Sequence, residues 1–109
     1  MENRTLKEIH IEFGISRRAI QGYEKEGLVH ATSKMERGYL LYDEEMVERI
    51  KLIKLYQELG FKVKEIKEII DAPPAVKKAA LKERIGKLKG EKTKMNHLIQ
   101  QAEKMLEEL

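Results

Sequence analysis

Apolar residues recur every three or four positions from Leu6 to Phe13, which is the period of a helix with one buried face. Thr5 and Glu8 stand three residues apart at the start of this stretch, in the pattern of a capping box. Gly14 follows the last apolar residue and is the expected end of the helix. The pattern therefore predicts a short first helix between Thr5 and Gly14.

A second helix is predicted directly after the first. Ser16 is its expected N-cap, and Ala19, Ile20 and Tyr23 form its expected inward face. Gly27 is its expected terminator. Two helices joined by a short turn that contains glycine form a helix-turn-helix.

The pattern changes after Gly27. Residues 28–33 (LVHATS) and 38–42 (GYLLY) are short and rich in β-formers, and the polar residues 34–37 (KMER) join them. We expect these segments to form a small β-hairpin, the wing of a winged helix, beside the two helices.

A further pair of helices is predicted after the hairpin. Asp43 is the expected cap of a third helix that carries Glu44 and Glu45 in its first turn, where negative charge suits the helix dipole. Gly60 closes this helix, and a fourth, short helix follows over residues 61–71. In the third helix Met46, Ile50, Ile53 and Leu59 recur at helical spacing, with Val47 and Tyr56 flanking them. In the fourth helix the inward-facing apolar residues are Val63, Ile66, Ile69 and Ile70.

Pro73 and Pro74 mark the clearest break in the chain, and one long helix is expected beyond them. Its apolar seam steps by alternating fours and threes, interrupted only by Lys92. A 3.5-residue repeat that no later segment can cover predicts a coiled coil with a partner helix. The expected dimer interface consists of Leu81, Ile85, Leu88, Lys92, Met95, Ile99, Ala102, Leu106 and Leu109.

The predicted fold is therefore mostly α. Residues 1–71 form a winged helix-turn-helix DNA-binding domain with a small β-hairpin wing and a further helix pair. Residues 72–76 form a proline-containing linker, and residues 77–109 form a long C-terminal coiled-coil helix for dimerisation.

The composition excludes several kinds of site. The chain has no cysteine, which rules out disulfides and thiolate metal sites, and its three histidines lie far apart. We therefore expect neither a metal nor a cofactor. The net charge of +3 is concentrated in residues 72–109, with nine basic and five acidic residues, so charge alone does not identify a nucleic-acid binder.

The sequence shows no arrangement of side chains for catalysis. Ser16 is explained as a helix cap, and the glycines separate helices without forming a phosphate-binding loop. An enzyme is therefore not expected.

No apolar run reaches the length of a membrane span and the first ten residues lack a signal-peptide core, so we expect a cytoplasmic, nucleoid-associated protein without membrane contact.

Basic residues at two places are candidates for DNA contacts. Arg17 and Arg18 lie at the start of the second helix, where cations oppose the helix dipole and so do not serve helix stability. Lys34 and Arg37 lie on the expected hairpin tip, which in a winged helix lies over the sugar-phosphate backbone. Tyr23 fits either the core or a phosphate contact through its hydroxyl.

Three segments resemble the MerR family of bacterial transcription regulators, over essentially the whole chain. Residues 15–29 (ISRRAIQGYEKEGLV) resemble the family pattern S-x-R-T-L-R-Y-Y-E-x-x-G-L-L. Residues 37–45 (RGYLLYDEE) resemble G-Y-R-x-Y-x-x-E, and residues 58–70 (ELGFKVKEIKEII) resemble L-G-F-x-L-x-E-I-x-x-x-L.

The resemblance implies a homodimer, joined by an antiparallel coiled coil, that binds a palindromic operator in double-stranded promoter DNA. Such regulators typically bend and untwist the promoter spacer so that RNA polymerase can use both promoter elements. In an antiparallel seam Lys92 faces Met95 in one register and Ala102 after a slip of one heptad, and the sequence leaves both open.

Carried over residue by residue, Arg18 matches the family's arginine, Tyr23 its second tyrosine, and Gly38 and Tyr39 its wing. The chain departs from the pattern at Ala19, Gln21, Gly22 and Leu40, which replace threonine, arginine, tyrosine and arginine. Fewer phosphate contacts imply weaker promoter distortion, although Gln21 can read an adenine edge. The expected DNA-binding residues are Ser16, Arg17, Arg18, Gln21, Tyr23, Lys34, Arg37, Gly38 and Tyr39.

Two other functions fit the same pattern. One is an architectural or chromosome-anchoring DNA-binding protein, and the other is a helical adaptor that has lost DNA binding and recruits a protein through its coil. Family members usually carry an effector-binding segment after the long helix. We expect the sequence to be either an N-terminal fragment or a short member without its own sensor, and the effector stays unidentified.

Overall fold

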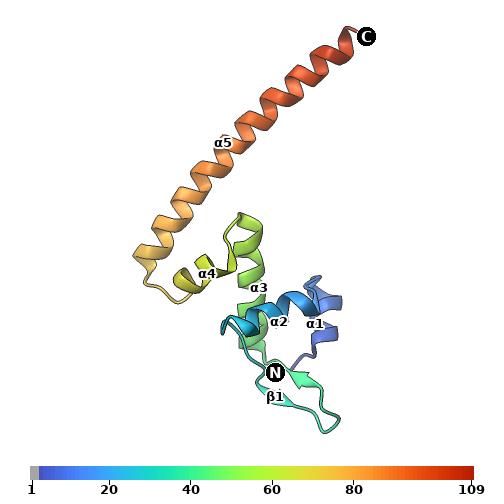
Figure 1. The fold of residues 1–109 in the computed structure, drawn as a ribbon, viewed down its shortest axis with the longest axis vertical. Helices are drawn as coiled ribbons and strands as arrows, with labels where there is room; N and C mark the ends of the chain where they lie inside the picture. The colour runs from blue at the N-terminus through green and yellow to red at the C-terminus, as the bar shows by residue number, and fades with distance from the viewer. Residues whose placement is uncertain (1–2) are drawn as a thin grey trace. The chain divides into compact units, whose positions relative to one another are not determined.

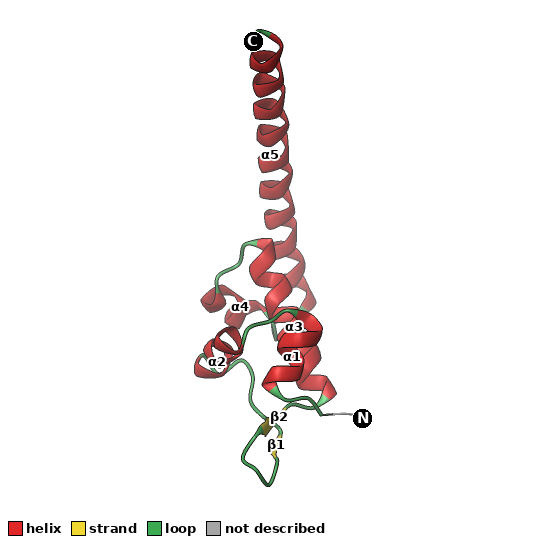
Figure 2. Ribbon diagram, turned by 90° about the vertical axis from the view of Figure 1, so that its right-hand side faces the viewer, coloured by secondary structure: helices red, strands yellow, loops and turns green. Residues whose placement is uncertain are grey.

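The computed structural model describes residues 3–109, which belong to two compact units. The first unit ends at Asp71 and the second spans Ala72–Leu109. Figure 1 and Figure 2 show the elements in two views. In chain order the elements are α1 (Leu6–Phe13), α2 (Arg17–Lys25), β1 (Ser33–Lys34), β2 (Leu40–Leu41), α3 (Glu44–Leu59), α4 (Val63–Ile69) and α5 (Pro74–Glu107).

The predicted helix starts are confirmed by their cap hydrogen bonds. The Thr5 hydroxyl accepts from the Glu8 backbone N–H at 3.2 Å, and the Glu8 carboxylate accepts from the Thr5 N–H at 3.0 Å. Ser16 Oγ accepts from the Ala19 N–H at 3.0 Å, and Asp43 Oδ1 accepts from the Met46 N–H at 2.8 Å. These side chains satisfy backbone donors that have no partner within a helix, which fixes where α1, α2 and α3 begin.

The end of α2 is closed by a Schellman motif, as Gly27 predicted. Gly27 has φ of +76°, and its N–H donates to the carbonyl of Glu24, while the Leu28 N–H donates to the carbonyl of Tyr23. The chain therefore turns sharply after α2, and Leu28 and Val29 enter the core.

One hydrophobic core lies within the first unit, where α1 packs on α2 and α3 on α4. Its buried side chains come from all four helices and from the segments between them. They are Ile9, Ile15, Ile20, Tyr23, Leu28, Val29, Tyr42, Met46, Val47, Ile50, Ile53, Tyr56, Ile66, Ile69 and Ile70.

The hairpin is smaller than predicted. Ser33 pairs with Leu41 and Lys34 with Leu40, so each strand has two residues, and residues 28–32 are outside the ladder. Leu28 and Val29 are buried as core anchors and not as strand residues, because the Schellman turn directs them inward. Lys34 lies within β1, so its expected place at the hairpin tip was wrong.

The long helix begins earlier than predicted. Pro74 is the first residue of α5, so the helical segment starts there and not at residue 77. A proline is tolerated in the first turn of a helix because the N–H it lacks would have no partner there. No residue of α5 is buried, and its seam is open to solvent, with Met95 59% and Leu106 71% exposed.

Candidate nucleic-acid interface

One face of α2 is open to solvent along the whole helix. Its members recur at helical spacing, and they are Arg17, Arg18, Gln21, Gly22 and Lys25. The opposite side carries Ile20 and Tyr23, which are buried in the core. The exposed face holds three cations and no acidic residue, so it presents an electropositive surface of the kind that binds a phosphate backbone.

Tyr23 lies in the core, and its expected contact with DNA stays a prediction. The side chain is 1% exposed, and its hydroxyl donates to Gln57 Oε1 at 2.5 Å across to α3. Burial raises the pKa of the Tyr23 phenol, and the charge of Glu58 raises it further. The hydroxyl is therefore engaged inside the protein and holds α2 against α3.

A hollow of about 600 Å³ separates the hairpin from the starts of α1 and α2. It brings Arg17 together with Gly38 and Tyr39, which were predicted from separate segments. The Tyr39 ring is 60% exposed. The lining residues are Thr5, Leu6, Lys7, Arg17, Met35, Gly38, Tyr39 and Leu40.

A second, open hollow of about 410 Å³ lies between α1 and the start of α2. Its lining residues are Leu6, Lys7, His10, Ser16, Arg17 and Arg18. Lys7 and Arg17 line both hollows, so these two cations lie where the hollows adjoin. Gln21, Lys34 and Arg37 line neither hollow, although all three are exposed.

Two basic residues of this surface were missed in the sequence. Lys7 follows the first residue of α1 and faces both hollows. Lys25 lies seven residues after Arg18 and so shares the exposed face of α2. That i+7 spacing is a signal from which Lys25 could have been found, whereas Lys7 required the packing of α1 against α2.

The hairpin turn depends on glycine. Gly38 has φ of +89°, a conformation that L side chains rarely adopt, and its N–H donates to the carbonyl of Met35 at 2.8 Å. The Met35 N–H donates to the carbonyl of Tyr39 at 2.9 Å. This turn places Arg37 at the tip and Tyr39 at the edge of the first hollow.

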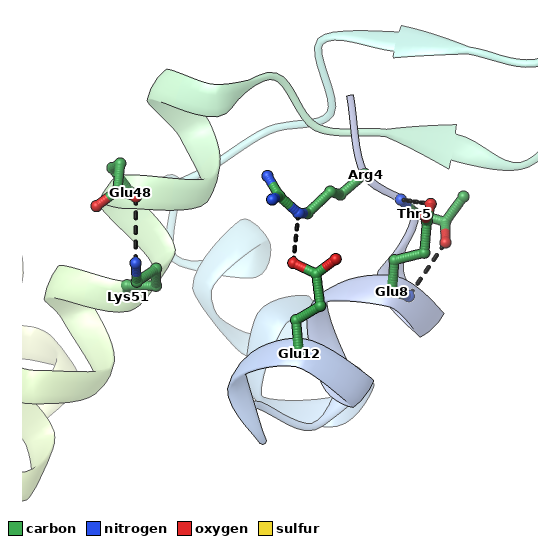
Figure 3. A network of polar contacts seen from close by, with 6 residues as sticks. All are labelled: Arg4, Thr5, Glu8, Glu12, Glu48 and Lys51. Carbon is green, nitrogen blue, oxygen red and sulfur yellow. Dashed lines mark hydrogen bonds and ion pairs between the residues drawn. The ribbon is translucent and has the colours of Figure 1, made fainter. Parts of the chain in front are cut away.

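The start of α1, which carries Lys7, is held by its capping box (Figure 3). The hydrogen bond from the Thr5 backbone lowers the pKa of the Glu8 carboxyl, because it favours the charged form. Glu8 is thus engaged at the cap, next to the lysine that faces the hollows.

Two further ion pairs lie on α1 and on α3 (Figure 3). Arg4 Nε donates to the Glu12 carboxylate at 2.6 Å, and Lys51 on α3 pairs with Glu48 at 3.2 Å. The Lys51 ammonium also lies 4.6 Å from the centroid of the Phe13 ring, within cation–π range. The contact between Lys51 and Phe13 joins α3 to α1, while Arg4 and Glu12 are paired within the segment before α1 and α1 itself.

Two family models match the chain. Residues 4–73 match the MerR HTH family regulatory protein model, and residues 47–109 match the model described as MerR, DNA binding. The two matches overlap and together cover the chain from residue 4 to its last residue.

Curated relatives agree with the models. The HTH-type transcriptional activator mta of Bacillus subtilis (strain 168) is 33% identical over 93 residues, which cover 85% of this chain and 36% of the relative. The mercuric resistance operon regulatory protein of Bacillus cereus is 37% identical over 57 residues, or 52% of this chain and 43% of the relative. The chain therefore spans well under half the length of these relatives.

Solved structures share the fold. The N-terminal part of the Bacillus subtilis multidrug transporter activator, MtaN, matches with a TM-score of 0.70 and 31% identity over 94% of this chain and 97% of that chain. HiNmlR, a MerR family regulator without its sensor domain that was solved bound to promoter DNA, has a TM-score of 0.73. The match covers 96% of this chain and 88% of that chain, but at 18% identity it supports the fold alone.

No helix within residues 3–109 has the length and apolar character to cross a membrane. The chain belongs to the MerR family of helix-turn-helix regulatory proteins.

Proposed function

We propose that this chain binds double-stranded promoter DNA as a homodimer and regulates transcription there. The observation that carries the proposal is the exposed cationic face of α2, which continues into the hollow bordered by the hairpin. In this assignment residues 1–71 form the DNA-binding domain, and the long helix after the prolines forms the dimerisation element. The membership of the MerR family and the promoter DNA bound to HiNmlR support the choice of ligand.

The exposed residues divide into two roles. Arg18 and Gln21 lie on the outer face of α2 and read base edges, since arginine pairs with guanine and glutamine with adenine in the major groove. Lys7, Arg17 and Tyr39 line the hollow beside the hairpin and contact phosphates.

The remaining cations extend the phosphate contacts at both ends of the surface. Lys25 continues the α2 face, while Lys34 and Arg37 lie on the hairpin, where they follow the neighbouring stretch of backbone. Ser16 caps α2, and Gly38 shapes the turn, so both place other residues against DNA.

The departures from the family pattern reduce the number of side chains that can contact DNA. Gly22 is exposed, and a Cβ added there meets nothing within 4 Å, so this part of α2 has no side chain to offer a phosphate. Leu40 likewise gives the hollow an apolar wall where the family pattern has arginine. We therefore propose that the protein bends and untwists the promoter spacer for RNA polymerase with fewer phosphate contacts, and hence a lower salt dependence, than the pattern implies.

Dimerisation through an antiparallel coiled coil of α5 completes the proposal. Every seam residue of α5 is at least partly exposed, and a stripe of this length requires a partner helix. Two DNA-binding domains then face the two halves of a palindromic operator.

The test measures operator affinity by fluorescence anisotropy at moderate salt. Arg18→Ala is expected to weaken binding at least tenfold and to relax the preference for the base that Arg18 reads. The control is Lys64→Ala, which removes an exposed cation from α4 that lines neither hollow. Equal affinities for the Arg18 variant and the control would contradict the placement of α2 in the groove.

A footprint separates promoter regulation from DNA packaging. A regulator protects one palindromic site that overlaps a promoter, whereas an architectural protein protects many dispersed sites. Dispersed protection, with no change in transcription from the bound promoter, would contradict the proposed function.

A further inference from the structure

The residues that flank the seam of α5 differ on its two sides. In heptad notation Ile85, Lys92, Ile99 and Leu106 are a positions, and Leu81, Leu88, Met95, Ala102 and Leu109 are d positions. The neighbouring e positions are Lys82, Lys89, Asn96 and Glu103, and the g positions are Arg84, Glu91, Leu98 and Met105. All four e residues are therefore polar, and three of them are charged, with the two lysines towards the N-terminal end. The g side becomes apolar towards the C-terminus.

Two apolar g residues need an explanation that the seam alone does not give. Leu98 is 54% and Met105 67% exposed on the helix. Flanking positions of a two-stranded coil are normally charged, because they lie at the edge of the interface. An apolar residue there is buried only if the partner offers an apolar surface at the same level.

A parallel pair of α5 helices places like charges together. Equivalent residues then face each other, so Lys92 meets the partner's Lys92 within the seam, and Arg84 lies beside the partner's Lys89. Both juxtapositions bring cations together in a partly desolvated interface. The charge pattern therefore favours the antiparallel arrangement of the proposed function, on which the following inference rests.

The antiparallel registers that align the seam differ by slips of one heptad, and two of them place Lys92 opposite Met95 or Ala102. When the two-fold axis lies between residues 93 and 94, Lys92 faces Met95. On the e side, Glu103 then lies at the level of the partner's Lys82, away from the centre. Lys89 and Lys92 of both copies gather around the two Asn96 side chains, with no carboxylate among them on that side. Four cations at the centre of the interface disfavour this register.

The other register places the two-fold axis at residue 97, and we infer that the dimer adopts it. Lys92 then faces Ala102, whose small side chain leaves room for the lysine stem to run to the edge. The partner's Glu103 lies at the level of Lys89 and Lys92, so each carboxylate serves two lysines. Among the residues that the structure describes, these three charged side chains make no ion pair within their own helix, so they are available to the partner.

The same register accounts for the exposed Leu98 on the g side, whereas Met105 lies at the level of the partner's Glu91. Leu98 meets the partner's Leu98 across the two-fold axis, next to Met95 and Ile99, which pair with each other. Asn96 meets the partner's Asn96 on the opposite edge, where two amides can donate and accept reciprocally. One register therefore satisfies the seam lysine, the e-side charges and the exposed leucine together.

Cysteine cross-linking tests the register, because residues 1–109 contain no cysteine. Met95→Cys protein comprising residues 1–109 is mixed with tagged Ile99→Cys protein, and the mixture is oxidised. A heterodimeric disulfide is expected, since the two residues face each other within the seam. A Lys92→Cys and Met95→Cys mixture, and Met95→Cys protein alone, are expected to give little product.

Sedimentation of the reduced mixtures separates the possible failures. A dimer that cross-links best through Lys92→Cys and Met95→Cys, or in neither mixture, overturns the register and leaves the proposed function intact. A dimer cross-linked by Met95→Cys alone is parallel and overturns it as well. A monomer overturns both the register and the proposed dimer.

A charge reversal gives a second test with opposite outcomes for the two registers. Lys89→Glu places a carboxylate beside the partner's Glu103 when the axis is at residue 97, so the dimer dissociation constant is expected to rise at least threefold at low salt. With the axis between residues 93 and 94, the same change relieves the central repulsion and tightens the dimer, which would overturn the inference. Lys94→Glu, at a c position away from the interface, is the matched control.

Discussion

Replacing Tyr23 with phenylalanine separates a core role from a DNA contact. The variant keeps the ring, which is 1% exposed, and removes only the hydroxyl that donates to Gln57 at 2.5 Å. A buried hydrogen bond contributes about 0.5–1.5 kcal/mol net. Gln57 is only half-buried, so water can partly replace the lost donor. We therefore expect the free energy of unfolding to fall by about 1 kcal/mol, and operator affinity to stay within twofold.

Urea denaturation at one fixed protein concentration measures the first quantity, because a dimer's apparent stability depends on concentration. Fluorescence anisotropy with operator DNA at constant salt measures the second. The matched variant is Gln57→Leu, which removes the acceptor from the α3 side and leaves the Tyr23 hydroxyl unpaired. A double-mutant cycle of the two changes is expected to show a coupling of about 0.5–1 kcal/mol between them.

The opposite result would refute the assignment of Tyr23 to the core. If Tyr23→Phe weakens operator binding tenfold while the urea midpoint stays unchanged, the hydroxyl contacts phosphate in the complex. The hydrogen bond to Gln57 would then have to break when DNA binds.

Three further predictions concern stability. Asp71→Asn removes the carboxylate of the bidentate pair with Arg49, whose two hydrogen bonds are both 2.9 Å. Because the Asp71 side chain is 71% exposed, the free energy of unfolding in urea is expected to fall by less than about 1 kcal/mol. A larger fall would show that solvent does not screen this pair. Burial and the hydrogen bond to Glu24 raise the pKa of Tyr42, so its contribution to the free energy of unfolding is complete below about pH 10 and is lost as the pH rises further. Tyr42→Phe should therefore reduce the loss of stability above that pH. An alkaline unfolding curve that the substitution leaves unchanged would contradict this role of the Tyr42 hydroxyl. Gly22→Ala adds a methyl group into open space within a helix and should raise the free energy of unfolding by about 0.8–1 kcal/mol, whereas a loss would show that the glycine is needed for packing.

Helix starts could be predicted from the sequence because a cap is a local structure. Thr5, Ser16 and Asp43 each bond a backbone N–H three residues ahead, so the signal and its partner lie within four residues of chain. The same holds for Gly27, whose positive φ ends α2 whatever packs around it. These features need no knowledge of the tertiary fold.

The hairpin could not be predicted in its true extent, because the β-leaning residues before it serve another purpose. Leu28 and Val29 have the composition of a strand, yet the turn after α2 inserts them into the core. Only Ser33 and Lys34 are left to pair with β2. The free energy gained by burying these two side chains thus outweighs their β-propensity, which contributes less than a buried core position does.

The exposed side of α2 follows from its buried side, and this explains why the sequence predicted some members of the exposed face and missed others. A nine-residue helix that buries Ile20 and Tyr23 must expose the positions on the opposite side, where Arg18 and Lys25 lie. The sequence left Tyr23 open between the two sides, so the limits of the exposed face were open as well. Once the hydroxyl is bonded to Gln57, the rotation of α2 is fixed, and Lys25 joins the surface while Tyr23 leaves it. Tyr23, which was expected to touch DNA, thus determines which of its neighbours are exposed.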